Sequence, residues 1–397
     1  MALAARLGGT FSGKLQLRNQ GLRDQKVPSL KNSIWIHAAS LGEFEQGKSI
    51  IDGLRDQYPD KILVLTFFSS SGFEKRYDYP NVDHVLYLPY DRYRKMEKFV
   101  SSLDPELVII VKYEFWFNWM RILKRKNIPY VFISAVFRSD QFFMKKGFGP
   151  LREVLKSSTK LFVQNQSSID VLREFGFDNM VLAGDTRVDR TIEIVNEDFV
   201  SQEIEEWLDH QFCVIAGSSW PPEEKWIFSI YRNFPEWKWI LAPHEVSEAH
   251  ISEIQELFGE DIVTLSTILS DEYQSADPDV PVLLIDQIGL LSRLYRYGDL
   301  AVIGGGMGAG IHNTLEPAAY GVPVVFGKKY ENFQEAIDFI ELDVARSVET
   351  GTQLEAALQY FSTDAKREQV KETLHQYFKN HSGATESILQ QIKIILT

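Results

Sequence analysis

Residues 34–44 read Ile34-Trp35-Ile36-His37-Ala38-Ala39-Ser40-Leu41-Gly42-Glu43-Phe44, and this stretch sets the pattern for the rest of the chain. A short apolar run with β-branched residues predicts a buried strand. The small residues and the glycine that follow allow a tight turn, and Ser40 and Glu43 have the spacing of a helix start. The stretch therefore predicts a strand, a turn and a helix, which is the repeating unit of parallel α/β sheets.

The same alternation of strand and helix continues through the first half of the chain. Examples of the helices expected between the strands are residues 42–57, 114–125, 148–155 and 167–175. The expected strands of this half are residues 34–37, 61–67, 84–88, 107–111, 130–134, 160–164 and 180–183.

The alternation of strands and helices is interrupted between residues 185 and 209, where no strong strand is found. A second series of strands and helices then begins. Its expected strands are residues 212–216, 237–241, 261–265, 282–285, 300–303 and 323–326. Two such series predict an α/β protein of two Rossmann-like domains, residues 1–195 and 205–397, facing a central cleft. The last helices, after about residue 364, could cross back to the first domain.

Composition excludes several classes of protein. The chain has 397 residues, of which 44% are hydrophobic and 24% charged, as in a soluble globular protein. A net charge of −13 argues against a nucleic-acid partner. The one cysteine, Cys213, excludes an intrachain disulfide and suits a reducing cytoplasm. No run approaches the roughly 20 apolar residues of a membrane-spanning helix.

Positive charge is nevertheless concentrated in two stretches. Residues 1–34 carry six basic side chains against one acidic, and residues 118–160 carry ten against two. The second stretch mixes them with aromatic residues and includes Phe142, Phe143, Lys145 and Lys146. Such a mixture is typical of a surface that binds anionic lipid headgroups. A solvated helix face beside core aromatic residues would give the same sequence pattern.

Two carboxylates follow predicted strands of the first domain. Glu43 either forms a capping box with Ser40 or acts as a general base at the cleft, where the helix N-terminus favours its negative charge. Glu114 lies in Lys112-Tyr113-Glu114-Phe115-Trp116, directly after the strand at 107–111. It either faces the cleft or is a surface carboxylate that starts a helix.

A glycine-rich turn lies in the second domain. The sequence Gly304-Gly305-Gly306-Met307-Gly308-Ala309-Gly310 places five glycines in seven residues between a strand and a helix. Exposed backbone N–H groups there could bind an anion such as phosphate. The run is neither a Walker loop nor a clean dinucleotide fingerprint. Asn313 and Glu316, which follow, could cap the helix or hold ribose hydroxyls.

Two further turns of the second domain carry polar groups. Ser218 and Ser219 precede Pro221 and could either cap the next helix or bind a nucleotide phosphate. His244 follows the next strand and could serve a phosphate or a base. The sequence contains neither a metalloprotease motif nor a nucleophile elbow, and we expect neither a metal nor a cofactor.

Together these segments resemble the Kdo transferases, which add the acidic sugar Kdo to lipid A in Gram-negative bacteria. The matching segments keep the family's order through most of residues 34–340. They are His37-Ala38-Ala39-Ser40-Leu41-Gly42-Glu43, Glu114-Phe115-Trp116, Gly184-Asp185-Thr186-Arg187-Val188-Asp189, Gly217-Ser218-Ser219 and His312-Asn313-Thr314-Leu315-Glu316-Pro317-Ala318-Ala319-Tyr320-Gly321-Val322-Pro323-Val324.

The resemblance implies a GT-B fold and metal-independent, inverting transfer of Kdo from CMP-Kdo to a lipid A precursor. It makes Glu43 the general base and Glu114 a support for acceptor or donor sugar. The first domain would bind the acceptor and the second the nucleotide sugar. The implied CMP-binding residues are Ser218, Ser219, His244, Gly305, Gly306, Met307, Asn313 and Glu316. Those implied to face acceptor and membrane are the basic first 34 residues with Lys145, Lys146, Phe142 and Phe143.

The chain departs from the family in one place that concerns the donor phosphate. The family often has Pro-Arg-His after the second strand of its second domain, whereas this chain has Pro243-His244-Glu245. The resemblance also implies a location at the cytoplasmic face of the inner membrane, peripheral or held by an anchor outside this chain. The alternatives are a GT-B enzyme for another nucleotide sugar, such as a UDP-hexose transferase or epimerase, and a non-catalytic protein of the membrane surface.

Overall fold

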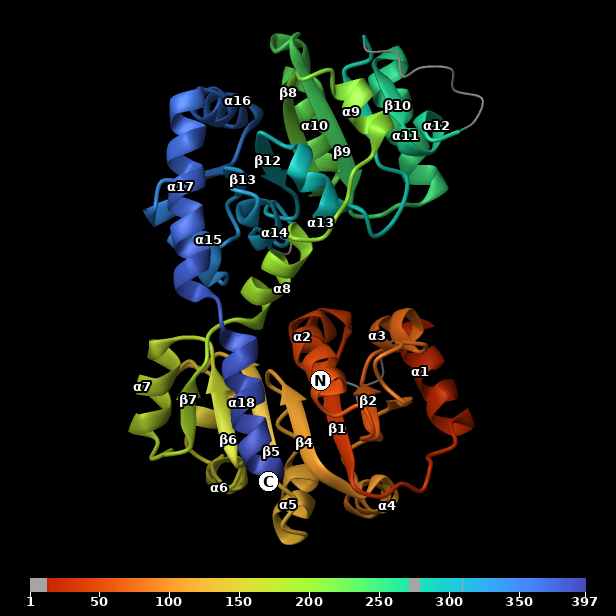
Figure 1. Cartoon of the computed structure of the whole chain (residues 1–397), viewed down its shortest axis with the longest axis vertical. Helices are drawn as coiled ribbons and strands as arrows, with labels where there is room; N and C mark the ends of the chain where they lie inside the picture. The colour runs from red at the N-terminus through yellow and green to blue at the C-terminus, as the bar shows by residue number, and fades with distance from the viewer. Residues whose placement is uncertain (1–12, 271–278, 309) are drawn as a thin grey trace. The chain divides into compact units, whose positions relative to one another are not determined.

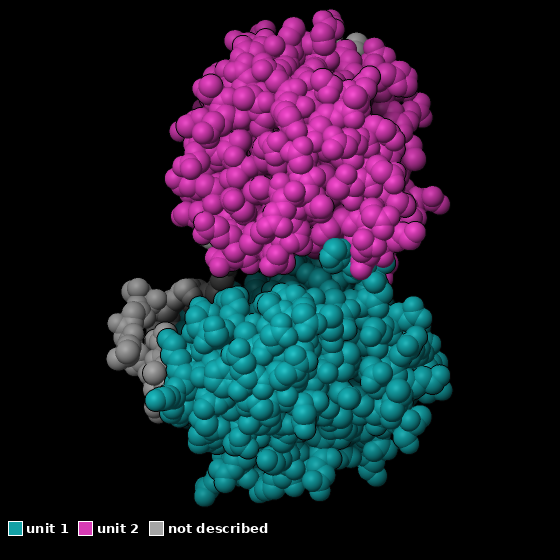
Figure 2. Space-filling view, turned by 90° about the vertical axis from the view of Figure 1, so that its left-hand side faces the viewer, with its two compact units in different colours: residues 1–190, 381–397 teal, residues 191–380 magenta. Residues whose placement is uncertain are grey.

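The computed structural model describes residues 13–270, 279–308 and 310–397. The chain divides into two compact units, coloured separately in Figure 2. Unit 1 contains residues 1–190 and 381–397, and unit 2 contains residues 191–380. Helix α8 (Thr186–Val195) leads from the first unit into the second, and helix α17 (Asp364–His381) leads back (Figure 1).

Within its described residues, unit 1 has a parallel sheet of seven strands in the order β3-β2-β1-β4-β5-β6-β7. The strands are β1 (Ser33–Ala38), β2 (Leu63–Phe67), β3 (His84–Tyr87), β4 (Pro105–Val111), β5 (Tyr130–Ala135), β6 (Lys160–Val163) and β7 (Met180–Leu182). The helices are α1 (Gly13–Asp24), α2 (Leu41–Gln57), α3 (Ser70–Arg76), α4 (Tyr93–Leu103), α5 (Phe117–Arg125), the short 3-10 helix η2 (Phe142–Met144), α6 (Gly149–Lys156), α7 (Gln166–Glu174) and the C-terminal α18 (Ala384–Leu396).

The sheet of unit 1 buries both of its faces. Successive side chains of a strand point to opposite faces, so Trp35 packs in one core cluster while Ile34 and Ile36 pack in the other. The Trp35 side is covered by residues of α4, α5, α6 and α7, and the opposite side by residues of α2 and α18. Burial on both faces explains why these strands read as continuous apolar runs.

The segment Gly184–Asp189 fastens the C-terminal helix to unit 1. The Thr186 hydroxyl donates to the carbonyl oxygen of Gln46 on α2, over 2.5 Å. The Asp189 carboxylate accepts the backbone N–H groups of Gly383 and Thr385, over 2.7 and 2.6 Å. Because Gly383 is the N-cap residue of α18 and has no side chain, Asp189 takes the place of the missing cap.

Replacing Asp189 with alanine is expected to lower the free energy of unfolding of unit 1 by about 1 kcal/mol, the usual value of a helix cap. Asp189→Asn keeps one acceptor oxygen and should lose less. Urea unfolding, monitored by hydrogen exchange of the α18 amides, measures the loss of unfolding free energy. Asp178→Ala, at an exposed position, is the control. Equal stability of Asp189→Ala and Asp178→Ala would contradict the capping role.

Unit 2 repeats the architecture. Its described residues form a second parallel sheet of seven strands in the order β10-β11-β9-β8-β12-β13-β14. The strands are β8 (Phe212–Ser219), β9 (Trp237–Pro243), β10 (Ile262–Thr264), β11 (Val282–Leu284), β12 (Leu300–Ile303), β13 (Val324–Gly327) and β14 (Ala345–Val348). The α-helices beside α8 and α17 are α9 (Gln202–Leu208), α10 (Pro221–Ile230), α11 (Glu248–Phe258), α12 (Leu265–Ile268), α13 (Leu291–Leu294), α14 (Leu315–Ala319), α15 (Gln334–Glu341) and α16 (Gly351–Phe361).

The fold class predicted from the sequence is confirmed: the chain folds as two α/β domains, each built on a parallel sheet. Two expectations about elements were wrong. The helix expected from residue 114 begins only at Phe117, because Lys112 turns the backbone with a φ of +61° and Trp116 is extended. Strand β14 was not predicted, since its sequence Ala345-Arg346-Ser347-Val348 is half polar.

Candidate functional site

Glu43 lies in the first turn of α2, three residues after the N-cap Ser40. The Ser40 side chain makes no cap hydrogen bond to the helix backbone. Its hydroxyl instead donates to the Glu43 carboxylate, and both side chains are partly exposed. The capping box is therefore not formed. The arrangement leaves a carboxylate at the carboxyl end of β1 with one hydroxyl as its partner.

Glu114 lies in the turn after β4, the strand that pairs with β1. Its Oε2 accepts a hydrogen bond of 2.6 Å from Nε1 of Trp116 and lies 3.9 Å from Nε2 of His37. Burial raises the pKa of Glu114, but His37 and Trp116 outweigh it, so that the pKa falls below its usual value. The interpretation of Glu114 as a surface carboxylate that starts a helix is wrong, because its side chain is only 22% exposed and α5 starts later.

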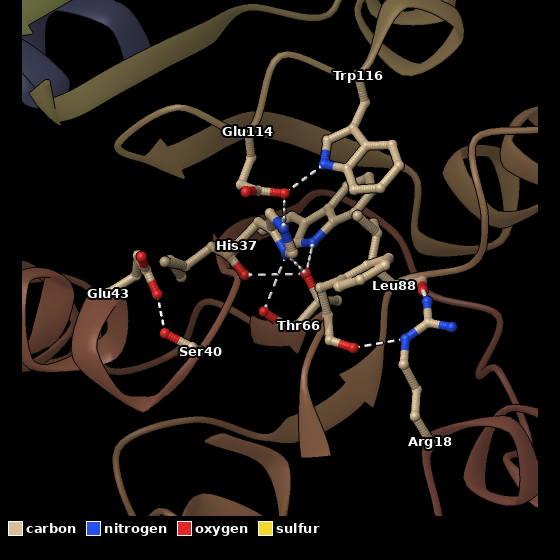
Figure 3. A network of polar contacts seen from close by, with 11 residues as sticks. Arg18, His37, Ser40, Glu43, Thr66, Leu88, Glu114 and Trp116 are labelled. Carbon is tan, nitrogen blue, oxygen red and sulfur yellow. Dashed lines mark hydrogen bonds and ion pairs between the residues drawn. The ribbon is translucent and has the colours of Figure 1, made fainter. Parts of the chain in front are cut away.

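Figure 3 shows how the two carboxylates are oriented. The Glu114 side chain points toward the indole of Trp116 and the imidazole of His37, while Glu43 points toward Ser40. Both carboxylates follow adjacent strands of one parallel sheet, the edge at which such sheets place their ligands. One can take up a proton while the other, held from two sides, is fixed in place.

Arg18 supports the same region from α1. Its guanidinium lies between the rings of Phe68 and Tyr90, 4.0 and 4.2 Å from their centroids. It donates to the carbonyl oxygens of Phe68 and Leu88, which follow β2 and β3. The Phe68 ring in turn packs on Trp116, with ring centroids 5.1 Å apart. Arg18 is only 2% exposed, so the expectation that the basic residues of 1–34 face a membrane is wrong for this side chain.

The basic and aromatic stretch divides into exposed and buried parts. Phe142 is 55% exposed and Lys145 and Lys146 are also exposed. Phe143, in contrast, is 2% exposed and packs edge-on against Phe115. The assignment of Phe143 to a membrane-facing surface is therefore wrong. A single turn of 3-10 helix directs neighbouring side chains to different sides, one outward and one into the core.

The glycine-rich turn of unit 2 is crowded by backbone. A Cβ atom on Gly304 would lie 2.1 Å from the carbonyl oxygen of Ser218, and one on Gly306 would lie 2.5 Å from Cα of Gly327. Gly305 has a φ of +89°. Its N–H donates to the buried Glu223 carboxylate over 3.1 Å, so this group already has an acceptor. The prediction of a free N–H for phosphate is wrong at Gly305, and the backbone N–H of Met307 also faces the Glu223 carboxylate, so Gly306 remains the candidate.

The two serines after β8 differ in their surroundings. Ser219 is buried, and its hydroxyl donates to the carboxylate of Glu224, which also contacts Nε2 of His250 at 3.0 Å. Ser218 is partly exposed and has a φ of +52°. Neither caps α10, whose N-cap is Trp220. Ser218 is thus the more accessible of the two for a ligand.

His244 lies in an aromatic stack at the ends of β8, β9 and β12. Its ring packs on Trp220 and His312, with centroids 4.7 and 4.3 Å away. Burial and the neighbouring His244 lower the pKa of His312 to about 4. Trp220 Nε1 lies 3.1 Å from Nε2 of His312, and a neutral imidazole can accept this hydrogen bond. At neutral pH, His312 is therefore an uncharged group.

Asn313 and Glu316 form a pair ahead of α14. The Asn313 amide donates to Oε1 of Glu316 over 2.9 Å, and its carbonyl oxygen accepts the N–H of Leu315. The N-cap residue of α14 is Thr314. Hence Asn313 orients the Glu316 carboxylate from outside the helix. The strand β12 before this segment pairs with β8, so both polar turns lie at one edge of the sheet.

Residues 13–270, 279–308 and 310–397 contain no group of three or more His, Cys, Asp or Glu side chains placed to hold a metal ion. In the same residues, none of the helices has both the length and the apolar character needed to cross a bilayer.

Comparison with known proteins relates the chain to one family. Residues 10–190 match the family model described as 3-deoxy-D-manno-octulosonic-acid transferase (kdotransferase). The 3-deoxy-D-manno-octulosonic acid transferase of Aquifex aeolicus is 23% identical over 331 residues, which cover 81% of this chain and 83% of that protein. The predicted resemblance is confirmed.

The chain is a glycosyltransferase related to the Kdo transferases.

Two further comparisons delimit what this glycosyltransferase shares with other proteins. A bifunctional glycosyltransferase/methyltransferase of Fusobacterium nucleatum is 23% identical over 376 residues, or 91% of this chain, but the chain spans only 57% of that protein. The solved UDP-GlcNAc 2-epimerase of Neisseria meningitidis has a TM-score of 0.63 at 13% identity, covering 91% of this chain and 99% of that chain. The second likeness shows the fold alone.

Proposed function

We propose that this glycosyltransferase transfers Kdo from CMP-Kdo to a lipid A precursor of the lipid IVA type, in lipopolysaccharide core synthesis. The observation that carries the proposal is the pair Glu43 and Glu114 at the ends of β1 and β4, inside the segment that matches the Kdo transferase model. Kdo transferases are the related enzymes over most of the chain's length. No metal, cofactor or nucleic acid takes part in the proposed reaction.

In the proposed mechanism Glu43 is the general base. Its carboxylate removes the proton from an acceptor hydroxyl as the hydroxyl oxygen attacks the anomeric carbon of Kdo. The bond from that carbon to the CMP phosphate oxygen breaks on the opposite face, and CMP leaves with the bonding electrons. The configuration is inverted, and the proton stays on Glu43 until solvent removes it. The Ser40 hydroxyl orients the carboxylate.

Glu114 has a supporting role in this mechanism. Trp116 and His37 hold its carboxylate from two sides, so it can accept hydrogen bonds from hydroxyls of the acceptor or donor sugar without moving. A fixed acceptor at the carboxyl edge of the sheet would orient the sugar ring for attack.

For the donor, the proposed contacts are in unit 2. The residues proposed to contact the donor are Ser218, Ser219, His244, Gly306, Asn313 and Glu316. Among these residues, Ser218 and Gly306 are the proposed phosphate contacts, and the Asn313–Glu316 pair is proposed for ribose. Because His312 is neutral, a different cation must balance the donor charge. The Lys329 ammonium, 2.5 Å from the carbonyl oxygen of Gly308, lies at this loop and could supply it.

The proposed membrane contact is the exposed patch of Phe142, Lys145, Lys146 and Phe148. The rings of Phe142 and Phe148 meet at 5.4 Å and are 55% and 40% exposed. Aromatic rings beside lysines fit the boundary between lipid headgroups and acyl chains. The patch would hold the enzyme at the cytoplasmic face of the inner membrane, where a lipid acceptor is found.

The double variant Lys145→Ala/Lys146→Ala is expected to bind anionic vesicles about 30-fold more weakly, because each lysine near such a surface contributes about 1 kcal/mol. The control Lys124→Ala/Lys126→Ala makes the same change of charge on exposed residues at the end of α5. Vesicle sedimentation measures both. An equal loss in the two variants would mean that net charge, rather than the patch, drives binding.

Release of nucleotide from a panel of donors tests the proposed function. The protein is incubated with CMP-Kdo or UDP-GlcNAc, each with and without a lipid A precursor in detergent. We expect CMP release only when CMP-Kdo and the lipid are both present. Turnover of UDP-GlcNAc would assign the site to a UDP-sugar enzyme instead. Vesicle binding without any turnover would indicate a non-catalytic protein of the membrane surface.

A further inference from the structure

His37 is a polar side chain placed inside the core of unit 1. It lies on β1 with 0% exposure, among strand residues that are otherwise apolar. Its ring meets Thr66 from β2, Trp119 from α5 and Glu114 from the turn after β4. Of these three residues only Glu114 titrates. Burying a histidine at this position costs desolvation free energy that burying a leucine would not. Its ring nitrogens are therefore expected to make compensating polar contacts.

One nitrogen of His37 is anchored. Nδ1 lies 2.8 Å from the hydroxyl oxygen and 3.0 Å from the carbonyl oxygen of Thr66. The same hydroxyl oxygen accepts a hydrogen bond of 2.8 Å from Nε1 of Trp35. The Thr66 hydroxyl can donate either to Nδ1 or to the carbonyl oxygen of Ile36, which lies 3.4 Å away. If the hydroxyl donates to Nδ1, the neutral ring carries its own proton on Nε2. If Nδ1 instead donates to the carbonyl oxygen of Thr66, a proton on Nε2 makes the ring an imidazolium.

The other nitrogen faces Glu114. Nε2 is buried and lies 3.9 Å from Oε2 of Glu114, within ion-pair range but beyond hydrogen-bond length. A neutral ring protonated only on Nδ1 would direct a lone pair at a carboxylate, which is repulsive. Both remaining forms, the neutral ring protonated on Nε2 and the imidazolium, place a proton between His37 and Glu114. Figure 3 shows the alignment of Thr66, His37 and Glu114.

We propose that His37 is a positioning residue: a proton on its Nε2 keeps Glu114 ionised and aimed at the substrate, while Thr66 fixes the ring. This inference rests on the proposed function for the role of Glu114 in turnover, but the His37–Glu114 coupling itself can be measured without substrate. His37 touches no reacting atom. It acts through Glu114, whose burial would otherwise favour the protonated form.

Two substitutions separate the anchored side of His37 from the side that faces Glu114. In His37→Gln the terminal amide nitrogen lies near the position of Nε2, so a donor toward Glu114 remains. In His37→Asn the amide nitrogen lies near the position of Nδ1, so the contact with Thr66 remains but Glu114 loses its partner. Both variants place an amide of similar polarity in the same buried site, and thermal unfolding checks that both fold.

The first measurement is the titration of Glu114 by NMR in protein with 13C-labelled glutamate, its signal assigned with Glu114→Gln. In His37→Asn the midpoint should rise by about one unit or more, because a neighbouring donor or cation has been removed. In His37→Gln it should stay near the wild-type value. Equal midpoints in wild type and His37→Asn would overturn the proposal, whatever the enzyme's substrate is.

The second measurement is turnover in a double-mutant cycle. In His37→Asn the acidic limb of the pH–rate profile should move upward by about one unit, so that kcat measured at a pH below that limb falls about tenfold. In a Glu114→Ala background the same substitution should have little further effect. A full and additive loss in that background would show that His37 is only structural. If the NMR shift is found but no Kdo is transferred, the proposed function fails and the coupling stands.

Discussion

Glu43→Gln is expected to lower turnover by about 10²–10⁴-fold, the usual contribution of a general base. The amide cannot accept the proton of the acceptor hydroxyl. Its carbonyl oxygen can still accept a hydrogen bond from the Ser40 hydroxyl, so the turn between β1 and α2 should keep its shape. Because Glu43 is partly exposed and caps no helix, the free energy of unfolding of unit 1 should change little.

The control for this variant is Glu45→Gln on the same helix. Glu45 is paired with Arg76 at 2.9 Å and carries the same charge two residues away, so its loss tests the effect of local charge alone. Steady-state kinetics with saturating donor and lipid acceptor measure both variants. Near-normal turnover of Glu43→Gln would remove Glu43 from the mechanism and leave the base to another residue.

Gly304→Ala is expected to destabilise unit 2 by about 3 kcal/mol, the upper end of what overpacking in a core costs. The added Cβ would lie 2.1 Å from the carbonyl oxygen of Ser218 and 2.7 Å from Cα of Ser219. Both are backbone atoms of β8, the strand paired with β12, so neither can rotate away. The clash must separate the two strand ends that carry the proposed donor site.

Gly308→Ala is the matched control in the same loop. The nearest atom to its added Cβ is the carbonyl oxygen of Gly305 at 3.5 Å, an ordinary contact, and the position is exposed. Hydrogen exchange measured by mass spectrometry reports the two units separately. Loss of protection in β8 and β12 of Gly304→Ala, with unit 1 unchanged, is the expected result. Wild-type protection in that variant would mean that the loop tolerates the clash and the crowding argument is wrong.

The strands could be predicted because burial on both faces leaves continuous apolar runs such as Ile34-Trp35-Ile36. Strand β14 could not be predicted in this way, because it is an edge strand whose two middle residues, Arg346 and Ser347, are only half buried. The start of α5 was predicted wrongly, because the positive φ of Lys112 depends on the turn after β4 rather than on the intrinsic conformational preference of lysine.

Within the candidate site, the position of the two carboxylates after strands was enough to single them out. Their partners were not accessible to the same reasoning. His37 and Trp116 lie within the same sequence motifs as the carboxylates, but only the folded sheet aims both side chains at Glu114. The burial of Arg18 likewise depends on Phe68 and Tyr90, which are far away in the sequence. The signal that could have exposed His37 is a polar residue inside an apolar strand.

The glycine-rich loop shows a different limit. Its composition predicted a phosphate site, yet three of its glycines have a structural reason to be there. Gly304 and Gly306 let backbone segments approach, and Gly305 adopts a positive φ. Glycine content alone cannot separate close backbone approach from ligand approach, because both require the absence of a Cβ.

The most direct test of the central claim is mass spectrometry of the lipid after reaction with CMP-Kdo. The wild-type protein should increase the mass of the lipid A precursor by one or more whole Kdo residues, and Glu43→Gln should leave most of the lipid unmodified. A wild-type protein that binds CMP-Kdo and the lipid but never changes the lipid's mass would contradict the account.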